Sequence, residues 1–178
     1  LTNDFSAPYL SEEENVEMIL QFPIYWEYEE EDCKSLLDLV RINHLTKEIY
    51  SYDIKTSGGQ TKDFITNLIE FRYDLQGSFY TEALKWLVRN DKKYEGYKVM
   101  PFQFIVESTS SPGSPQLFTL SDKVIEQGKI GWVSKTGVYH KGFDTLVKDL
   151  AWHKRNNLWD YTKDVYVSKG NTLINELQ

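Results

Sequence analysis

The chain has 178 residues, and its 20 basic and 27 acidic side chains give a formal net charge of −7 at pH 7. With 40% hydrophobic and 26% charged residues, the composition excludes a disordered, collagen-like or coiled-coil protein. The single cysteine, Cys33, excludes an intramolecular disulfide, a thiolate zinc site and an iron–sulfur cluster. Because no apolar stretch approaches about 18 residues, we expect one cytoplasmic domain over residues 1–178 without a membrane span.

The acidic balance argues at first against nucleic-acid binding, because phosphate contacts require lysine and arginine. Two acidic runs, at 12–14 and 27–32, are typical of solvated helix starts or turns. However, nucleases that hold divalent cations need clustered carboxylates, and an oligomer can collect its basic side chains around one channel. The net charge therefore leaves a role on nucleic acid open.

The first part of the chain predicts a helix and then a β-hairpin. Ser11 and Glu14 have the capping-box spacing, which predicts a short helix to about residue 20. Residues 21–26 are apolar and aromatic, and the strand-like pattern resumes over 33–42 after the acidic turn. These two runs predict paired antiparallel strands.

A third strand and a long helix are expected next. After a polar turn, residues 48–55 alternate as a strand, and the following Thr-Ser-Gly-Gly sequence ends it. Apolar residues at three- and four-residue steps over 62–89 predict one long helix that is kinked near Gly77.

The remaining pattern completes an α/β sandwich. We expect a buried strand over 99–106, a loop over 108–115, a short strand over 117–120, a helix that Ser121 caps and that continues with interruptions at Gly131 and Gly137, and a last helix over 143–156. The order predicts a mixed central sheet that starts with an antiparallel meander and is flanked by helices.

Two aspartates and a lysine meet at one end of the predicted meander. Asp53 and Lys55 lie two apart on a strand and therefore share a face, whereas Ile54 is expected to point into the core. Pairing across the turn opposes residues whose numbers add to about 90, which places Asp38 beside Asp53. Two carboxylates can hold Mg²⁺, and a lysine can orient a bound water. The alternative is an ordinary surface Asp–Lys pair.

Two further polar residues lie four apart on the long helix that follows. Gln76 and Tyr80 share one helical face, and Gly77 between them permits close approach. Taken singly, each is explained as well by a helix surface or by the edge of the core.

Taken together, these residues resemble the PD-(D/E)XK nuclease superfamily in its RecB-like branch, and most closely the RecE-type exonuclease domain of phages. The resemblance covers about residues 24–131, including segments 24–26, 71–73 and 102–109. It implies the fold of that superfamily and a metal-dependent exonuclease that hydrolyses linear double-stranded DNA from 5′ to 3′ in phage-type recombination. Alternatives are an endonuclease or another repair nuclease of this fold, or a non-catalytic DNA-binding module.

The resemblance also implies a role for each site residue. The implied catalytic set is Asp38, Asp53, Lys55, Gln76 and Tyr80, and the implied ligands of Mg²⁺, or of Mn²⁺ as a substitute, are Asp38, Asp53 and the main-chain carbonyl of Ile54. The family's upstream acid is replaced around Gln21 and Phe22, and Glu27 is the nearest substitute.

Implied partners are double-stranded DNA ends, a single-strand annealing protein and further copies of the chain in a ring, in the cytoplasm of a bacterium or a phage-infected cell. Arg72 is predicted to contact a DNA phosphate because it lies one helical turn before Gln76; Lys62, Lys154 and Arg155 are further candidates. Since the chain starts at Leu1, we expect it to lack an N-terminal part of the family's domain.

Overall fold

The computed structural model describes residues 7–110 and 115–171. The middle of the predicted loop over 108–115 and the last residues of the tail lie outside these ranges, as does the start of the chain. Within them, six strands form one sheet in the order β1-β2-β3-β5-β6, with β4 also pairing with β3. The strands are β1 (Val16–Tyr28), β2 (Glu31–Asn43), β3 (Glu48–Ser57), β4 (Lys98–Val99), β5 (Gln103–Ser108) and β6 (Gln116–Thr119).

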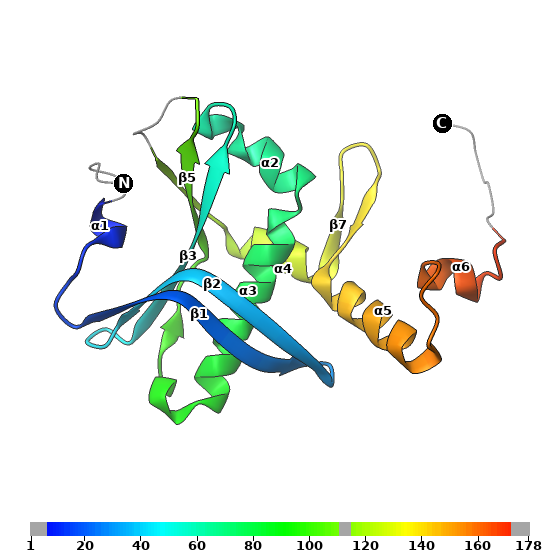
Figure 1. Ribbon diagram of the computed structural model, residues 1–178, viewed down its shortest axis with the longest axis horizontal. Coiled ribbons are helices and arrows are strands. Elements are labelled where there is room, and N and C mark those ends of the chain that lie inside the picture. The colour runs from blue at the N-terminus through cyan, green and yellow to red at the C-terminus, as the bar shows by residue number, and fades with distance from the viewer. Residues whose placement is uncertain (1–6, 111–114, 172–178) are drawn as a thin grey trace.

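The described residues also form a small separate hairpin and six helices. The helices are α1 (Ala7–Leu10), α2 (Phe64–Glu70), α3 (Tyr73–Asn90), α4 (Asp122–Ile130), α5 (Phe143–Asn156) and α6 (Lys163–Val167), with short 3₁₀ turns η1 (Thr61–Asp63) and η2 (Lys92–Tyr94), while the hairpin consists of β7 (Gly131–Val133) and β8 (Tyr139–Lys141). Figure 1 shows α3 lying along the sheet, with α5 and α6 extending away from it. No helix in the described ranges is long and apolar enough to cross a membrane.

The predicted fold class is confirmed. Strands β1, β2 and β3 form an antiparallel meander, whereas β5 runs parallel to β3, so the sheet is mixed. In the β2–β3 pairing Leu39 opposes Tyr52, a register within one residue of the expected one, and it brings the position of Asp38 next to Asp53. The face against α3 buries Leu37 and Ile49 together with Leu84 of the helix, and this packing holds the helix against the end of the meander.

The helix predicted to about residue 20 is wrong. Residues from Val16 onward form the start of β1, whose pairing with β2 begins at Val16 opposite Asn43. A capping-box spacing is a local signal, and the hydrogen bonds and burial gained along a 13-residue strand outweigh it. The N-terminal helical turn lies earlier, at Ala7–Leu10.

The long helix is broken, but not at the predicted place. It ends and restarts around Arg72, whose φ of +55° interrupts the helical backbone between α2 and α3. Gly77 instead lies inside α3, where a Cβ atom would come within 2.4 Å of the Leu120 side chain. The missing side chain therefore lets α3 approach the end of β6, and it does not kink the helix.

The C-terminal half differs from expectation in two further ways. The apolar run over 99–106 forms two strands, because residues 100–102 around Pro101 separate β4 from β5. Ser121 caps α4 as expected, since its Oγ accepts a hydrogen bond from the Val124 amide at 3.4 Å. The helix then ends at Gly131, whose φ of +96° starts the β7–β8 hairpin in place of the expected helical continuation. The helix expected over 143–156 is confirmed as α5 (Phe143–Asn156), but it is not the last one, because α6 follows it.

Candidate functional site

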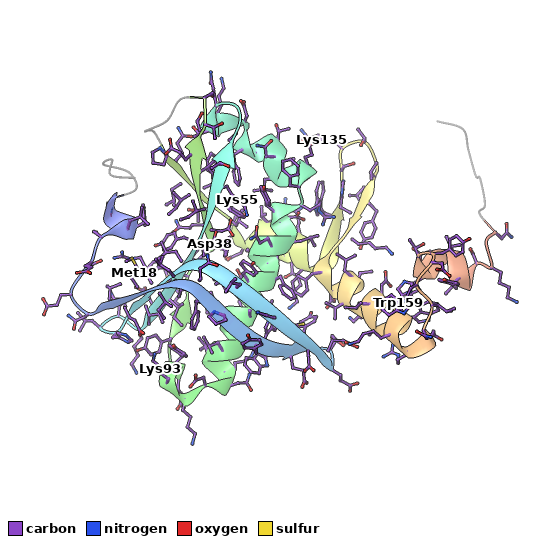
Figure 2. The ribbon with its side chains drawn as sticks, viewed as in Figure 1. Met18, Asp38, Lys55, Lys93, Lys135 and Trp159 are labelled. Carbon is purple, nitrogen blue, oxygen red and sulfur yellow. The ribbon has the colours of Figure 1, made fainter. Side chains whose placement is uncertain are left out.

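The Asp38 carboxylate lies where the ladder between β2 and β3 ends. Its Oδ2 accepts a hydrogen bond from the Ile54 amide at 3.1 Å, beyond the last backbone pair at Leu39 and Tyr52. Its Oδ1 accepts a hydrogen bond from Gln21 Nε2 of β1 at 3.0 Å. A side chain therefore takes the place of a ladder acceptor, and this fixes the Asp38 carboxylate next to β3. Figure 2 shows Asp38 and Lys55 in this central region, near the upper part of α3.

Asp53 is the buried member of the pair and is only 3% exposed. Its Oδ1 accepts a hydrogen bond from Gln76 Nε2 of α3 at 2.7 Å, and its Oδ2 forms an ion pair with Lys55 Nζ at 2.6 Å. Burial raises the pKa of the Asp53 carboxyl above its ordinary value, Asp38 adds to this, and Lys55 and Gln76 partly oppose it. The site thus holds a buried carboxylate, whose charged form is disfavoured by the loss of water, beside the ammonium group of Lys55.

Aromatic rings hold the Lys55 ammonium against this carboxylate. Nζ lies 4.7 Å from the centre of the Tyr73 ring and 6.0 Å from that of Phe104, distances at which a cation is attracted to the ring face. The lysine side chain remains 20% exposed. It can therefore face both the buried Asp53 and a molecule that enters from solvent.

Ile54 does not point into the core. Because the Asp53 and Lys55 face of β3 is the one that α3 covers, Ile54 lies on the opposite face and is 37% exposed. The expectation had the two faces reversed, since polar residues at a site can occupy the buried face of a strand. The Ile54 main chain nevertheless lies in the site, because its amide donates a hydrogen bond to the Asp38 carboxylate.

Of the two helical candidates, only Gln76 reaches the carboxylates. Tyr80, one turn later, is partly buried between the core clusters, with its ring centre 6.0 Å from that of Phe102. Within the described residues, its hydroxyl has no hydrogen bond to the site. In this structure Tyr80 supports the packing under Gln76.

Glu27 is not at the site. It lies opposite Asp32 near the turn of the β1–β2 hairpin, six residues and therefore about 20 Å along the strand from Gln21. Gln21 lies beside Asp38, at the position where the resemblance led us to expect an acidic side chain, and it contributes an amide there. The absence of that acid at Gln21 was the feature of the sequence that could have identified this residue as part of the site.

Asp38 and Asp53 fit a divalent cation that keeps most of its water ligands. No group of three or more His, Cys, Asp or Glu side chains in the described ranges is placed to hold a metal ion. Mg²⁺, however, often binds through only one or two carboxylates, because it retains several waters. The buried Oδ2 of Asp53 contacts Lys55 Nζ and no other hydrogen-bond donor among the described residues, so it can still contribute a lone pair to a cation.

The raised pKa of Asp53 predicts a pH dependence of stability in metal-free protein. A carboxyl whose folded pKa is raised stabilises the fold while protonated, and this contribution is lost as the pH rises through the raised pKa. Asp53→Asn stays neutral at every pH, so its stability relative to wild type should grow as the pH rises above about 4, the ordinary pKa of an aspartate. Thermal unfolding in EDTA measures this, with the exposed Asp32→Asn as control. A stability gap that shrinks as the pH rises would contradict the buried carboxylate.

Arg72 is engaged inside the protein. Its Nε and Nη2 donate to the two oxygens of the buried Asp74 carboxylate at 3.0 and 3.1 Å, and Nη2 also donates to the Lys141 carbonyl at 2.8 Å. Trp132 Nε1 donates to the same carboxylate at 3.0 Å. Arg72 therefore lies at the break before α3, not on the helical face with Gln76, and it ties this break to the β7–β8 hairpin.

We expect Arg72→Ala to lower the free energy of unfolding by about 2 kcal/mol, because the buried Asp74 carboxylate loses a charged partner. Chemical denaturation measures the loss, and Arg89→Ala, at an exposed position late in α3, serves as control. The DNA contact predicted for Arg72 stays a prediction. Unchanged stability together with a slope of log affinity against log salt that falls by about one unit would support that contact.

The other basic candidates lie apart from the carboxylates. Lys154, in α5, pairs with Glu31 at the start of β2, and Arg155 is exposed beside it. Lys62, in η1, lies just before α2. Only Lys62 is therefore close in the chain to the elements that form the site.

Comparison with protein-family models finds no match for this sequence, and comparison with curated proteins finds none either. A solved structure with a similar fold is the crystal structure of a protein from Eubacterium rectale named "Putative exonuclease". The TM-score is 0.52 at 13% sequence identity, and the match covers 99% of this chain but 58% of that one. This chain thus spans little more than half of the length of that structure. The similarity concerns the fold, and it shows that the mixed sheet with its flanking helices is shared with this protein.

Proposed function

We propose that the protein is a metal-dependent deoxyribonuclease of the PD-(D/E)XK type that degrades linear double-stranded DNA from its ends. The observation that carries the proposal is the meeting of Asp38, Asp53, Lys55 and Gln76 at the end of β3. Two carboxylates beside a lysine suit phosphodiester hydrolysis, in which a cation and a positioned water act together. The fold shared with a protein named as an exonuclease supports the same reaction class.

In this mechanism Asp38 and Asp53 would hold Mg²⁺, or Mn²⁺ in its place, with the main-chain carbonyl of Ile54 as a further ligand. The bound cation supplies charge that stabilises the phosphate transition state and lowers the pKa of a bound water. Lys55 Nζ orients the attacking water, because it lies beside Asp53 and faces solvent on its other side. Gln76 holds the Asp53 carboxylate in position through its 2.7 Å hydrogen bond. Tyr80, as placed, keeps this part of α3 packed.

The finer assignments belong to the same proposal. They are 5′-to-3′ polarity, a role in phage-type recombination with a single-strand annealing partner, assembly of several copies into a ring, and action in the cytoplasm. An exonuclease suits an acidic chain because few phosphates need to be bound at one DNA end, and copies in a ring can share their basic side chains.

Labelled DNA tests the proposal directly. Linear duplex labelled at either the 5′ or the 3′ ends should be degraded in Mg²⁺ and remain intact in EDTA, with the 5′ label released first. Closed circular DNA should survive under the same conditions. Rapid nicking of circles would favour the endonuclease alternative, and binding without cleavage in either metal would favour a non-catalytic module.

A further inference from the structure

Phe71 presents an aromatic ring to solvent at the break between α2 and α3. It is 58% exposed, although phenylalanine is among the residues most often buried. Its backbone is fixed on the C-terminal side, since the neighbouring Arg72 is tied to Asp74 and to the Lys141 carbonyl. The exposed ring therefore has a defined place in the fold.

This ring is connected to the candidate site through Tyr73. The centres of the Phe71 and Tyr73 rings lie 5.8 Å apart, and the Tyr73 ring also lies 4.7 Å from Lys55 Nζ. Tyr73 is supported by the buried Phe64, which stacks on it at 5.7 Å. Phe71 is thus one ring beyond the lysine that faces the carboxylates.

Phe71 does not belong to the apolar groove of the same region. That groove, of about 420 Å³, lies between α2, β6, α4 and β7, where Ile65, Ile69 and Trp132 contribute to its wall. Phe71 is not among its lining residues, and its ring contact is with Tyr73 on the site side. Filling the groove would therefore leave Phe71 exposed.

We propose that Phe71 is a stacking platform for the nucleobase next to the phosphate at the catalytic site. The inference rests on the proposed nuclease function and names a binding subsite within it. In a nucleotide one sugar separates the base from its phosphate. In the structure one ring, that of Tyr73, separates Phe71 from Lys55, so a base on Phe71 could belong to the nucleotide whose phosphate lies at the site. Stacking accepts every base, as a nuclease that proceeds through any sequence requires, and it needs no positive charge on an acidic chain.

The test is a binding cycle between one side chain and one base. Affinity for linear duplexes with a single-stranded 5′ end is measured by fluorescence anisotropy in Ca²⁺, with an abasic site moved through the first nucleotides. In wild type, removal of one particular base should weaken binding about ten-fold. Phe71→Ala should show the same ten-fold loss on intact DNA and no further loss on that abasic DNA, whereas Phe71→Trp should behave as wild type.

Ile65→Ala is the matched control, because Ile65 is 61% exposed on α2, the short helix that ends just before Phe71, and it lines the groove. It should leave affinity unchanged, and thermal unfolding confirms that both alanine variants are folded. If wild type hydrolyses DNA in Mg²⁺ but Phe71→Ala binds as tightly, or still responds to the abasic site, the stacking platform is wrong and the nuclease function stands. If wild-type protein neither binds nor hydrolyses DNA, the proposed function itself fails.

Discussion

Lys55→Ala is expected to reduce the single-turnover rate of DNA hydrolysis by about a thousand-fold. The Lys55 ammonium lies 2.6 Å from the Asp53 carboxylate, and from this position its N–H groups can orient the attacking water. Because the lysine is not a metal ligand, calorimetric titration with Mn²⁺ should show binding that is as tight as in wild type or tighter, since a positive charge next to Asp53 is removed.

Lys85→Ala provides the matched control for this variant. Lys85 also forms an ion pair, with Glu82 at 3.0 Å, but it lies on α3 beyond the site. Its removal should leave the hydrolysis rate near that of wild type. Turnover of Lys55→Ala at the wild-type rate would remove Lys55 from the mechanism, whatever its effect on folding.

Asp53→Asn should strongly reduce the rate of hydrolysis and abolish metal binding. The substitution keeps the size of the side chain and an oxygen that can accept the Gln76 hydrogen bond, but it removes the negative charge that a divalent cation requires. We expect a rate loss of about a thousand-fold and no measurable heat of Mn²⁺ binding. The loss of both properties distinguishes a ligand from Lys55, which affects only the rate.

The exposed Asp32→Asn at the far end of the hairpin is the control for this second variant, because it also removes one negative charge. It should bind Mn²⁺ and hydrolyse DNA as wild type does. If Asp53→Asn retained Mn²⁺ binding, the metal would be held elsewhere, and Asp53 would be a structural partner of Lys55 and Gln76.

The meander and the meeting of its polar residues could be predicted from the sequence. A short turn between two strands fixes their register, and register determines which residues are neighbours, so the positions of Asp38 and Asp53 followed from counting. Residues two apart on a strand share a face, and this placed Lys55 beside Asp53. The four-residue spacing on the helix put Gln76 and Tyr80 on one face, but only Gln76 reaches the carboxylates.

Several boundaries could not be predicted because tertiary contacts oppose the local signals. The capping-box spacing at Ser11 favours a helix, but pairing with β2 makes a strand of the residues from Val16 onward. The helical periodicity continues through Arg72, yet the helix is interrupted there, where the Arg72 guanidinium donates hydrogen bonds to the Asp74 carboxylate and the Lys141 carbonyl. Such outcomes depend on partners far along the chain, which periodicity does not record.

By itself, the sequence determined which strands form the meander and which carboxylates, lysine and amide face one end of it, because these follow from short-range geometry. Only the tertiary structure decided that Asp53 is buried under α3, that Tyr73 supports Lys55, that Gln21 takes the place predicted for Glu27, and that Arg72 is bound internally. The physical reason is that burial, ring contacts and the pairing of a charge depend on how separate elements pack, and packing is a property of the whole fold.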